Sequence, residues 1–217
     1  IITGDLPDVI DPLLGTIDDV RISASAIVMD GVGGILGQAG PDDLRPVSFL
    51  PFTGTMQFDT ADLANLEANG LLSDAILHEM CHVLGFGTIW PFLNLLQNPT
   101  QSGGTNPRFT GAMATQEYNA RFGTADTSVP VEATGGSQTA DNHWRESIFS
   151  NELMTGFLSP GSNPLSRVTI AQFADLGYQV DLSPADAFLL AAANSTAIST
   201  ANSTAALRSN PVAGDRV

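Results

Sequence analysis

Alternating apolar and polar residues predict three strands in the first third of the chain. From Val20 to Val28 every second residue is apolar, with arginine and serine between them, which is the period-two pattern of a half-buried strand. Residues 54–59 alternate in the same way and place a methionine and a phenylalanine on one face. Between these segments, glycines and an aspartate at 30–34 indicate a turn, followed by a glycine-containing strand through residues 35–37.

Helical periodicity and stop signals predict four helices within residues 60–176. The first covers Thr60 to Asn69 and is followed by glycine. The second begins with Ser73 as its N-cap and runs to about Leu84. It is apolar on nearly all sides, so we expect it to be buried at the centre of the domain. Two further helices are expected at 111–122, within a segment rich in Asn, Gly and Thr, and at 166–176.

The second predicted helix carries a metal-binding pattern. Residues 78–82 read His-Glu-Met-Cys-His, and the only other histidine in the chain is His143. Residues four apart lie on one face of a helix, so His78 and His82 can bind the same ion. Catalytic zinc commonly has three protein ligands and one position for water. Glu79 can reach that water without being a ligand, and the pattern therefore indicates a zinc metallopeptidase.

The cysteine within this motif has two interpretations. Cys81 is the only cysteine of the chain, and as a thiolate it would be an alternative metal ligand or a redox switch. It lies away from the helix face that carries His78 and His82, and apolar Met80 and Val83 are near it in the sequence. We therefore expect Cys81 to be a small buried core residue.

The residues after the motif narrow the class of peptidase. Gly85 follows His82 by three positions, where glycine suits a helix that ends abruptly. In metzincin peptidases a third histidine comes three residues after this glycine, but this chain has Thr88 there. His143 comes far downstream, followed by a tryptophan and then by Glu-Leu-Met at 152–154. This combination resembles the leishmanolysin (gp63-like) metallopeptidases, in particular their bacterial relatives, in which a long insertion precedes the third histidine.

The resemblance implies a role for each residue of the site. His78, His82 and His143 would be the zinc ligands, Glu79 the general base, and Met154 the Met-turn residue beneath the metal. The chain departs from the eukaryotic members in having one cysteine where they are rich in disulfides. It also has no tyrosine two residues after the methionine, where some metzincins place a further ligand or oxyanion donor.

The resemblance also implies the fold and its division. We expect an α+β, metzincin-type catalytic domain: a small twisted mixed sheet packed on a buried active-site helix, plus a loop-rich C-terminal lobe with helices. The catalytic domain would cover residues 1–181, with an upper lobe at about 1–87, an insertion at about 88–140 and a lower lobe at about 141–181. Residues 182–217 would be a helix and a low-complexity tail or linker.

A further expectation concerns the substrate. In the metzincin layout the strand before the active helix is the sheet edge that pairs with an extended peptide. Thr55, Met56 and Gln57 would then form that edge strand. Metzincin domains usually have a strand and a long helix that residues 1–15 do not show, so we expect an N-terminal piece to be missing.

Composition limits the setting and the partners. The formal net charge is -15 and all 8 basic residues are arginine, so nucleic-acid binding is excluded as a function. No apolar run is long enough to span a membrane. The aspartates offer oxygen ligands for structural Ca²⁺ in addition to the catalytic Zn²⁺. We expect a secreted bacterial endopeptidase acting on proteins or peptides, and the sequence does not predict its oligomeric state.

Two other interpretations stay open at this stage. In a gluzincin-type peptidase a downstream glutamate replaces the third histidine, and Glu117 would be the candidate. In a different class of protein, the same fold would be a zinc-stabilised, inactive adhesin or binding module, although a structural zinc has no use for Glu79 as a base. We expect Glu146 and Glu152 to be local structural groups and not catalytic ones.

Overall fold

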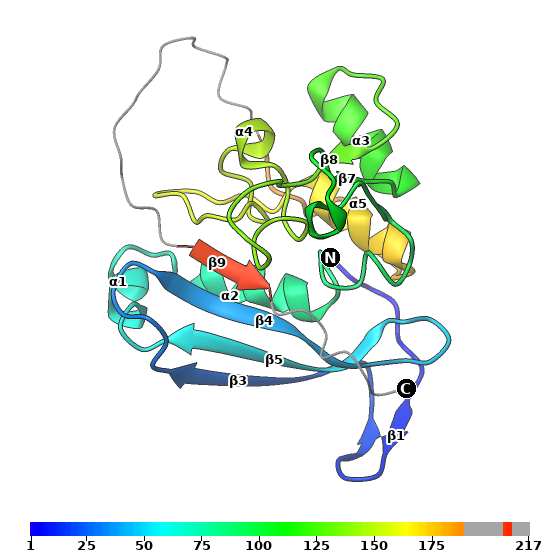
Figure 1. Ribbon diagram of the computed structural model, residues 1–217. Helices are drawn as coiled ribbons and strands as arrows, with labels where there is room; N and C mark the ends of the chain where they lie inside the picture. The colour runs from blue at the N-terminus through cyan, green and yellow to red at the C-terminus, as the bar shows by residue number, and fades with distance from the viewer. Residues whose placement is uncertain (189–205, 210–217) are drawn as a thin grey trace.

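The computed structural model describes residues 1–188 and 206–209 and shows an α+β fold (Figure 1). A mixed sheet with two helices forms one part, and a loop-rich part with three further helices lies against it. This confirms the predicted fold class. In the described part of the chain, no helix combines the length and the hydrophobicity needed to cross a membrane.

The main sheet has four strands in the order β3-β5-β4-β9. Their bounds are β3 (Arg21–Ile27), β4 (Ile35–Leu44), β5 (Pro51–Asp59) and β9 (Ala206–Ser209). β5 runs parallel to β3 and antiparallel to β4, and β9 pairs in parallel with the other side of β4. A segment near the C-terminal end of the chain therefore joins a sheet whose other strands all precede the metal-binding motif (Figure 1).

The predicted substrate edge strand is wrong. Thr55, Met56 and Gln57 lie in β5, whose backbone pairs with β3 on one side and with β4 on the other. A strand in this position has no free row of N–H and C=O groups for an extended peptide. Alternation in a sequence reports which faces of a strand are apolar and does not report how many neighbours the strand has.

β3 is an outer strand of the sheet, and it is less buried than its alternation predicts. Ile22 and Ile27 are half-buried, but Ala24 and Ala26 are exposed, and Val28 just beyond the strand is 84% exposed. In the residues that the structure describes, no strand pairs with the outer side of β3. Small apolar residues on an outer strand can satisfy the pattern without being covered.

The motif-bearing helix lies directly on this sheet. α1 (Leu63–Ala68) is followed by α2 (Leu72–Val83), which packs on β4 and β5. Gly54 in β5 leaves no room for a Cβ against Val83, so the glycine is what allows the helix to approach the strand closely. α2 begins one residue before the predicted cap, and neither Leu71 nor Ser73 caps it through a side chain.

The other part of the molecule is mostly irregular. Its helices are α3 (Ala112–Phe122), α4 (Glu146–Phe149) and α5 (Arg167–Leu176), with a 3₁₀ turn η1 at Thr100–Ser102. Three two-residue strands form a small sheet: β6 (Leu96–Gln97), β7 (Arg108–Phe109) and β8 (Val129–Pro130). The sequence also did not predict the N-terminal hairpin of β1 (Val9–Asp11) and β2 (Gly15–Ile17).

Aromatic residues form the core of this second part. Phe86, Trp90, Phe109, Trp144 and Phe149 are fully buried, and their rings pack edge-to-face, tilted or stacked at centroid separations of 4.8–5.7 Å. Such pairs stabilise a core beyond the area they bury. Trp144, the residue after His143, belongs to this cluster, so the loop that carries His143 is anchored in the core.

The predicted C-terminal helix and tail are only partly described. Residues 183–184 form a turn, residues 185–188 have no regular secondary structure, and no helix starts there. The predicted low-complexity tail lies outside the described residues except for β9.

Candidate metal centre

Two of the three histidines come from one face of α2. His78 and His82 are one turn apart and both fully buried. The helix ends after Val83, and Gly85 reverses the chain with φ of 108°. A Cβ on Gly85 would lie 2.7 Å from Ile89, so this position requires glycine both for its backbone angle and for its packing.

The third histidine is brought in by an irregular loop. Gly87, with φ of 74°, allows the chain after α2 to lie directly against the backbone of Asn142. His143 follows Asn142, and its carbonyl accepts a hydrogen bond of 2.9 Å from the Glu132 amide. The predicted insertion therefore returns the chain to the end of the motif helix.

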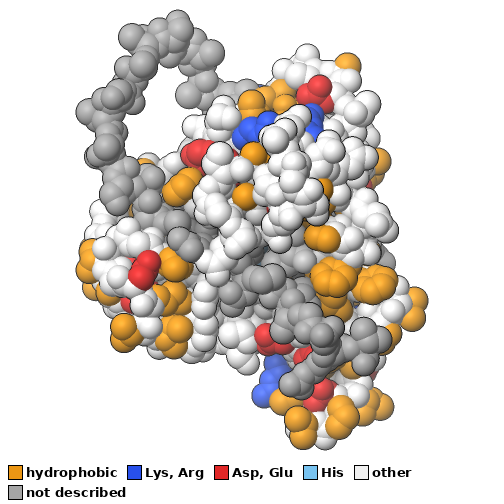
Figure 2. Space-filling model, viewed as in Figure 1, with side chains coloured by type: hydrophobic (Ala, Val, Ile, Leu, Met, Phe, Trp, Pro, Cys, Tyr) orange, Lys and Arg blue, Asp and Glu red, His pale blue; other side chains and the backbone are white. Residues whose placement is uncertain are grey.

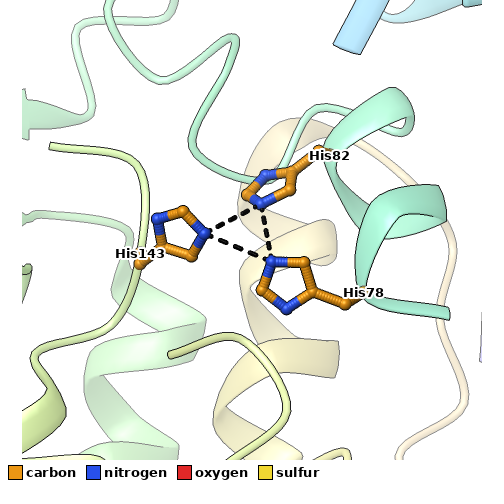
Figure 3. A group of neighbouring side chains, drawn as sticks. All are labelled: His78, His82 and His143. Atoms are coloured by element: carbon orange, nitrogen blue, oxygen red, sulfur yellow. Dashed lines mark hydrogen bonds between the residues drawn. The ribbon is translucent and has the colours of Figure 1, made fainter. Parts of the chain in front are cut away.

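The three imidazoles converge on one point (Figure 3). The Nε2 atoms of His78 and His82 are 2.9 Å apart, those of His82 and His143 are 3.1 Å apart, and those of His78 and His143 are 3.2 Å apart. Two nitrogens bound tetrahedrally to one zinc at ~2.0–2.1 Å would be about 3.3–3.4 Å apart. The triangle is thus close to the size that a single zinc ion requires.

The opposite ring nitrogens fix the protonation of the cluster. Each Nδ1 faces a backbone carbonyl: Leu153 at 2.7 Å from His78, Phe86 at 2.9 Å from His82, and Thr139 at 2.9 Å from His143. A carbonyl only accepts, so each Nδ1 carries the hydrogen and each neutral ring has a lone pair on Nε2. Three lone pairs facing one another repel, and a bound cation is what makes the arrangement favourable.

Burial keeps these rings neutral. All three histidines have 0% exposure, and no histidine surface is visible on the face drawn in Figure 2. Burial, together with the proximity of His143, lowers the pKa of His78 to about 3. Burial lowers the pKa of His143 to about 4 and that of His82 well below its usual value. Neutral imidazole is the form that binds a metal.

Glu79 lies beside the cluster and is not part of it. The group of mutually close ligand atoms contains His78, His82 and His143 alone among the described residues. Glu79 is fully buried, and neither carboxylate oxygen has a hydrogen-bond partner in the described structure. Burial raises its pKa well above the usual range. Gly37 of β4 faces it, since a Cβ there would lie 2.9 Å from Glu79 Oε1.

The predicted Met-turn residue lies in the segment that holds His78. Met154 is fully buried, and its carbonyl accepts a 2.9 Å hydrogen bond from the Trp144 amide. The preceding residue, Leu153, provides the carbonyl that binds His78. This segment therefore contacts the site through its backbone, while the role of the methionine side chain stays a prediction.

The alternative third ligand, Glu117, is wrong. It lies on α3, and its carboxylate is bound by Arg167 at 2.7 and 3.0 Å. His143 occupies the place near His78 and His82 that Glu117 would have to take. Cys81 is buried in the core and outside the histidine group, and burial raises its thiol pKa, so the prediction of a core residue is confirmed.

Sequence reasoning missed two buried carboxylates that hold the loop of His143. Glu132 accepts the amides of Ala133, Thr134 and Glu146, and Asp141 accepts the amides of Thr100 and Gln101. Both carboxylates are at most 6% exposed. The usable signal was weak: Asp141 stands close to His143 in a segment without regular structure, but Glu132 lies farther upstream and has no such signal.

The predicted calcium gains no support from the structure. Asp5, Asp18 and Asp19 are close enough to hold an ion, but all three are exposed. Mutual repulsion, with Asp19 contributing most, raises the pKa of Asp18. Exposed acidic groups often gather without binding an ion.

Comparisons with known proteins agree with the sequence pattern. The family model described as leishmanolysin, peptidase M8, matches residues 42–206. Leishmanolysin of Leishmania major is 29% identical over 143 residues, which cover 63% of this chain and 23% of that protein. Leishmanolysin of Leishmania donovani is 27% identical over 142 residues, covering 63% and 24%. The matched region spans about a quarter of these relatives. The family match covers most of the chain and includes every residue of the histidine cluster, so the chain belongs to the leishmanolysin family.

Proposed function

We propose that this chain is a zinc-dependent endopeptidase that hydrolyses peptide bonds of proteins. The observation that carries the proposal is the triangle of three neutral Nε2 atoms beside a buried carboxylate without a partner. His78, His82 and His143 would hold the metal. The histidine cluster fits zinc in ligand type, in number and in spacing.

The metal and the carboxylate would divide the chemistry between them. Bound zinc would polarise the scissile carbonyl and lower the pKa of a water molecule toward 7. Glu79 would accept a proton from the attacking water and later deliver it to the leaving amine. Burial alone raises the pKa of this carboxyl, and the positive charge of a bound zinc would lower it again, so that the carboxylate could accept the proton.

The surroundings of Glu79 support this assignment. A buried carboxylate that only served the fold would be bound by backbone or side-chain donors, as Glu132 and Asp141 are. Glu79 has no such donor among the described residues. An unpartnered buried charge destabilises a protein, so its presence next to the histidines favours a role in the reaction.

A Glu79→Gln variant tests the proposal. The substitution conserves shape and leaves the three imidazoles unchanged, so we expect one zinc per chain in both proteins. Cleavage of casein or of a fluorescent peptide should fall by at least ~10²-fold, the usual scale for a lost general base. Zinc content by mass spectrometry and circular dichroism provide the controls for metal binding and for folding.

Three outcomes would contradict the proposal in different ways. Retained cleavage by the variant would show that Glu79 is not the base. A wild-type protein that binds zinc but cleaves nothing would favour the adhesin or binding-module alternative. Absence of zinc after purification and reconstitution would remove the metal site itself.

We also propose that the enzyme acts outside the cell, on protein substrates. Membership of the leishmanolysin family supports this. Recovery of the native protein from culture medium, with none in washed cells, is the expected result.

A further inference from the structure

The carboxylate of Glu152 lies between two segments of the chain. Glu152 has 0% exposure. Its Oε1 accepts hydrogen bonds from the Ser166 amide at 3.1 Å, from the Ser166 hydroxyl at 2.7 Å and from the Thr169 hydroxyl. Its Oε2 accepts the Met154 amide at 2.6 Å. The side chain therefore ties the turn that contains Met154 to the first turn of α5.

This arrangement reaches His78 through one peptide unit. The Leu153 carbonyl, which binds His78 Nδ1 at 2.7 Å, belongs to the peptide whose nitrogen is the Met154 amide. Because a peptide unit is planar, fixing its N–H direction also fixes its C=O direction. Glu152 thus determines where the acceptor of the His78 hydrogen bond points.

A second route reaches His143. The Trp144 amide donates to the Met154 carbonyl at 2.9 Å, and the indole Nε1 donates to the Thr169 hydroxyl at 2.8 Å. Thr169 in turn donates to Glu152. The residue next to His143 is therefore held, at its backbone and at its side chain, by Met154 and Thr169, two residues that donate hydrogen bonds to Glu152.

We propose that Glu152 is a positioning residue for the metal site, which aims the imidazoles of His78 and His143 through the turn and Thr169. This goes beyond the proposed function but rests on its histidine site. The carboxylate suits the task because it is an acceptor only and all four of its neighbours donate. An amide of the same shape would put an NH₂ group against at least one donor. Outer partners of this kind change metal affinity by ~10–100-fold when they are replaced.

The test compares a Glu152→Gln variant with a matched control. Asp59→Asn serves as the control, because Asp59 is also fully buried and accepts three backbone amides, from Asp30, Gly31 and Ala61. None of these partners contacts a histidine. Both variants lose one carboxylate oxygen within a buried set of hydrogen bonds, so both should lower the free energy of unfolding. Only Glu152→Gln should weaken zinc binding, by ~10–100-fold in a competition with a chelator.

A second variant keeps the inference testable if Glu152→Gln does not fold, and a measurement on metal-free protein adds a readout that does not depend on zinc. Thr169→Val conserves shape, removes the link between Trp144 and Glu152, and should weaken zinc binding by a smaller factor. In metal-free protein, nitrogen NMR of the three histidines should show the His78 Nδ1 hydrogen exchanging faster in Glu152→Gln than in the wild type. The chain contains only these three histidines, so their signals can be assigned by substitution.

The outcomes separate this inference from the proposed function. Equal zinc affinity and equal His78 exchange in wild type, Glu152→Gln and Thr169→Val would overturn it, even if the wild type binds zinc and cleaves peptides. Equal weakening in Asp59→Asn would also overturn it, because the effect would then follow from stability alone. A wild type that binds no zinc would refute the proposed function, and the exchange of His78 would still decide the role of Glu152.

Discussion

The helix that carries His78 and His82 and the loop that carries His143 position their imidazoles in different ways. In α2 the backbone repeats itself, so two residues four apart share a face without further support. The loop has no such repeat. Asp141 in the loop accepts the amides of Thr100 and Gln101, and Glu132 accepts the amide of Glu146. Glu152 ties the neighbouring turn to the start of α5 in the same way.

The helix and the loop therefore depend on different interactions to keep the site geometry. Helix hydrogen bonds are local, and α2 also packs on β4 and β5. The loop depends on buried acceptors whose partners lie up to 41 residues away in the chain. A buried carboxylate is stable only when its donors are in place, so the loop should be the more easily disturbed of the two.

The largest expected effect comes from removing the metal. The metal would connect α2 to the loop, and its binding at a thousandfold excess over Kd would stabilise the fold by about 4 kcal/mol. After chelation, we expect amide hydrogen exchange to rise most at residues 128–155 and least in α2, which keeps its packing on the sheet. Exchange followed by mass spectrometry measures this. An equal rise in both regions would remove the contrast between them.

A smaller effect is expected when the loop loses one acceptor. Asp141→Ala leaves two amides and the Thr100 hydroxyl without their partner, and Asp141 has φ of 71°, which alanine tolerates poorly. We expect the free energy of unfolding to fall by about 2–3 kcal/mol. Asp141→Asn should lose less, because asparagine accepts this backbone conformation and keeps one oxygen. Urea unfolding of both variants makes the comparison, and equal losses would contradict it.

The smallest effect depends on pH. Burial raises the pKa of Glu146 to about 7, although a hydrogen bond with Thr155 lowers it in part. The folded protein therefore holds this proton more tightly than the unfolded chain. The stabilisation that results is present below pH ~4.5 and is lost as the pH rises through about 7.

Replacing Glu146 with glutamine should remove that dependence. Glu146 is only partly buried, so solvent reduces the effect. At pH 8 we expect Glu146→Gln to be more stable than the wild type by about 1–2 kcal/mol, with no difference at pH 4. Thermal unfolding at the two pH values is the measurement. A variant that is less stable at pH 8 would mean that the charged form of Glu146 is favoured in the fold.

The sequence predicted the helical half of the site better than the loop half. Spacing alone placed His78 and His82 on one helix face, because helical geometry is local. The assignment of His143 depended on resemblance to a family, since no local rule connects it to residues 61 positions earlier. Asp141 and Glu132 escaped attention because their roles depend on which amides the fold brings to them. β5 was placed at an edge because alternation carries no information on neighbouring strands.

The pairing of β9 with β4 has a consequence for access to the sheet. β9 occupies the side of β4 that does not face β5, and its residue 207 lies beside Gly37, which faces Glu79. An extended chain can add to the sheet at that edge only after β9 has left it. A strand tethered to its own sheet acts at an effective concentration on the order of millimolar. A free peptide present at micromolar levels would therefore have to bind this edge far more tightly than β9 does in order to displace it.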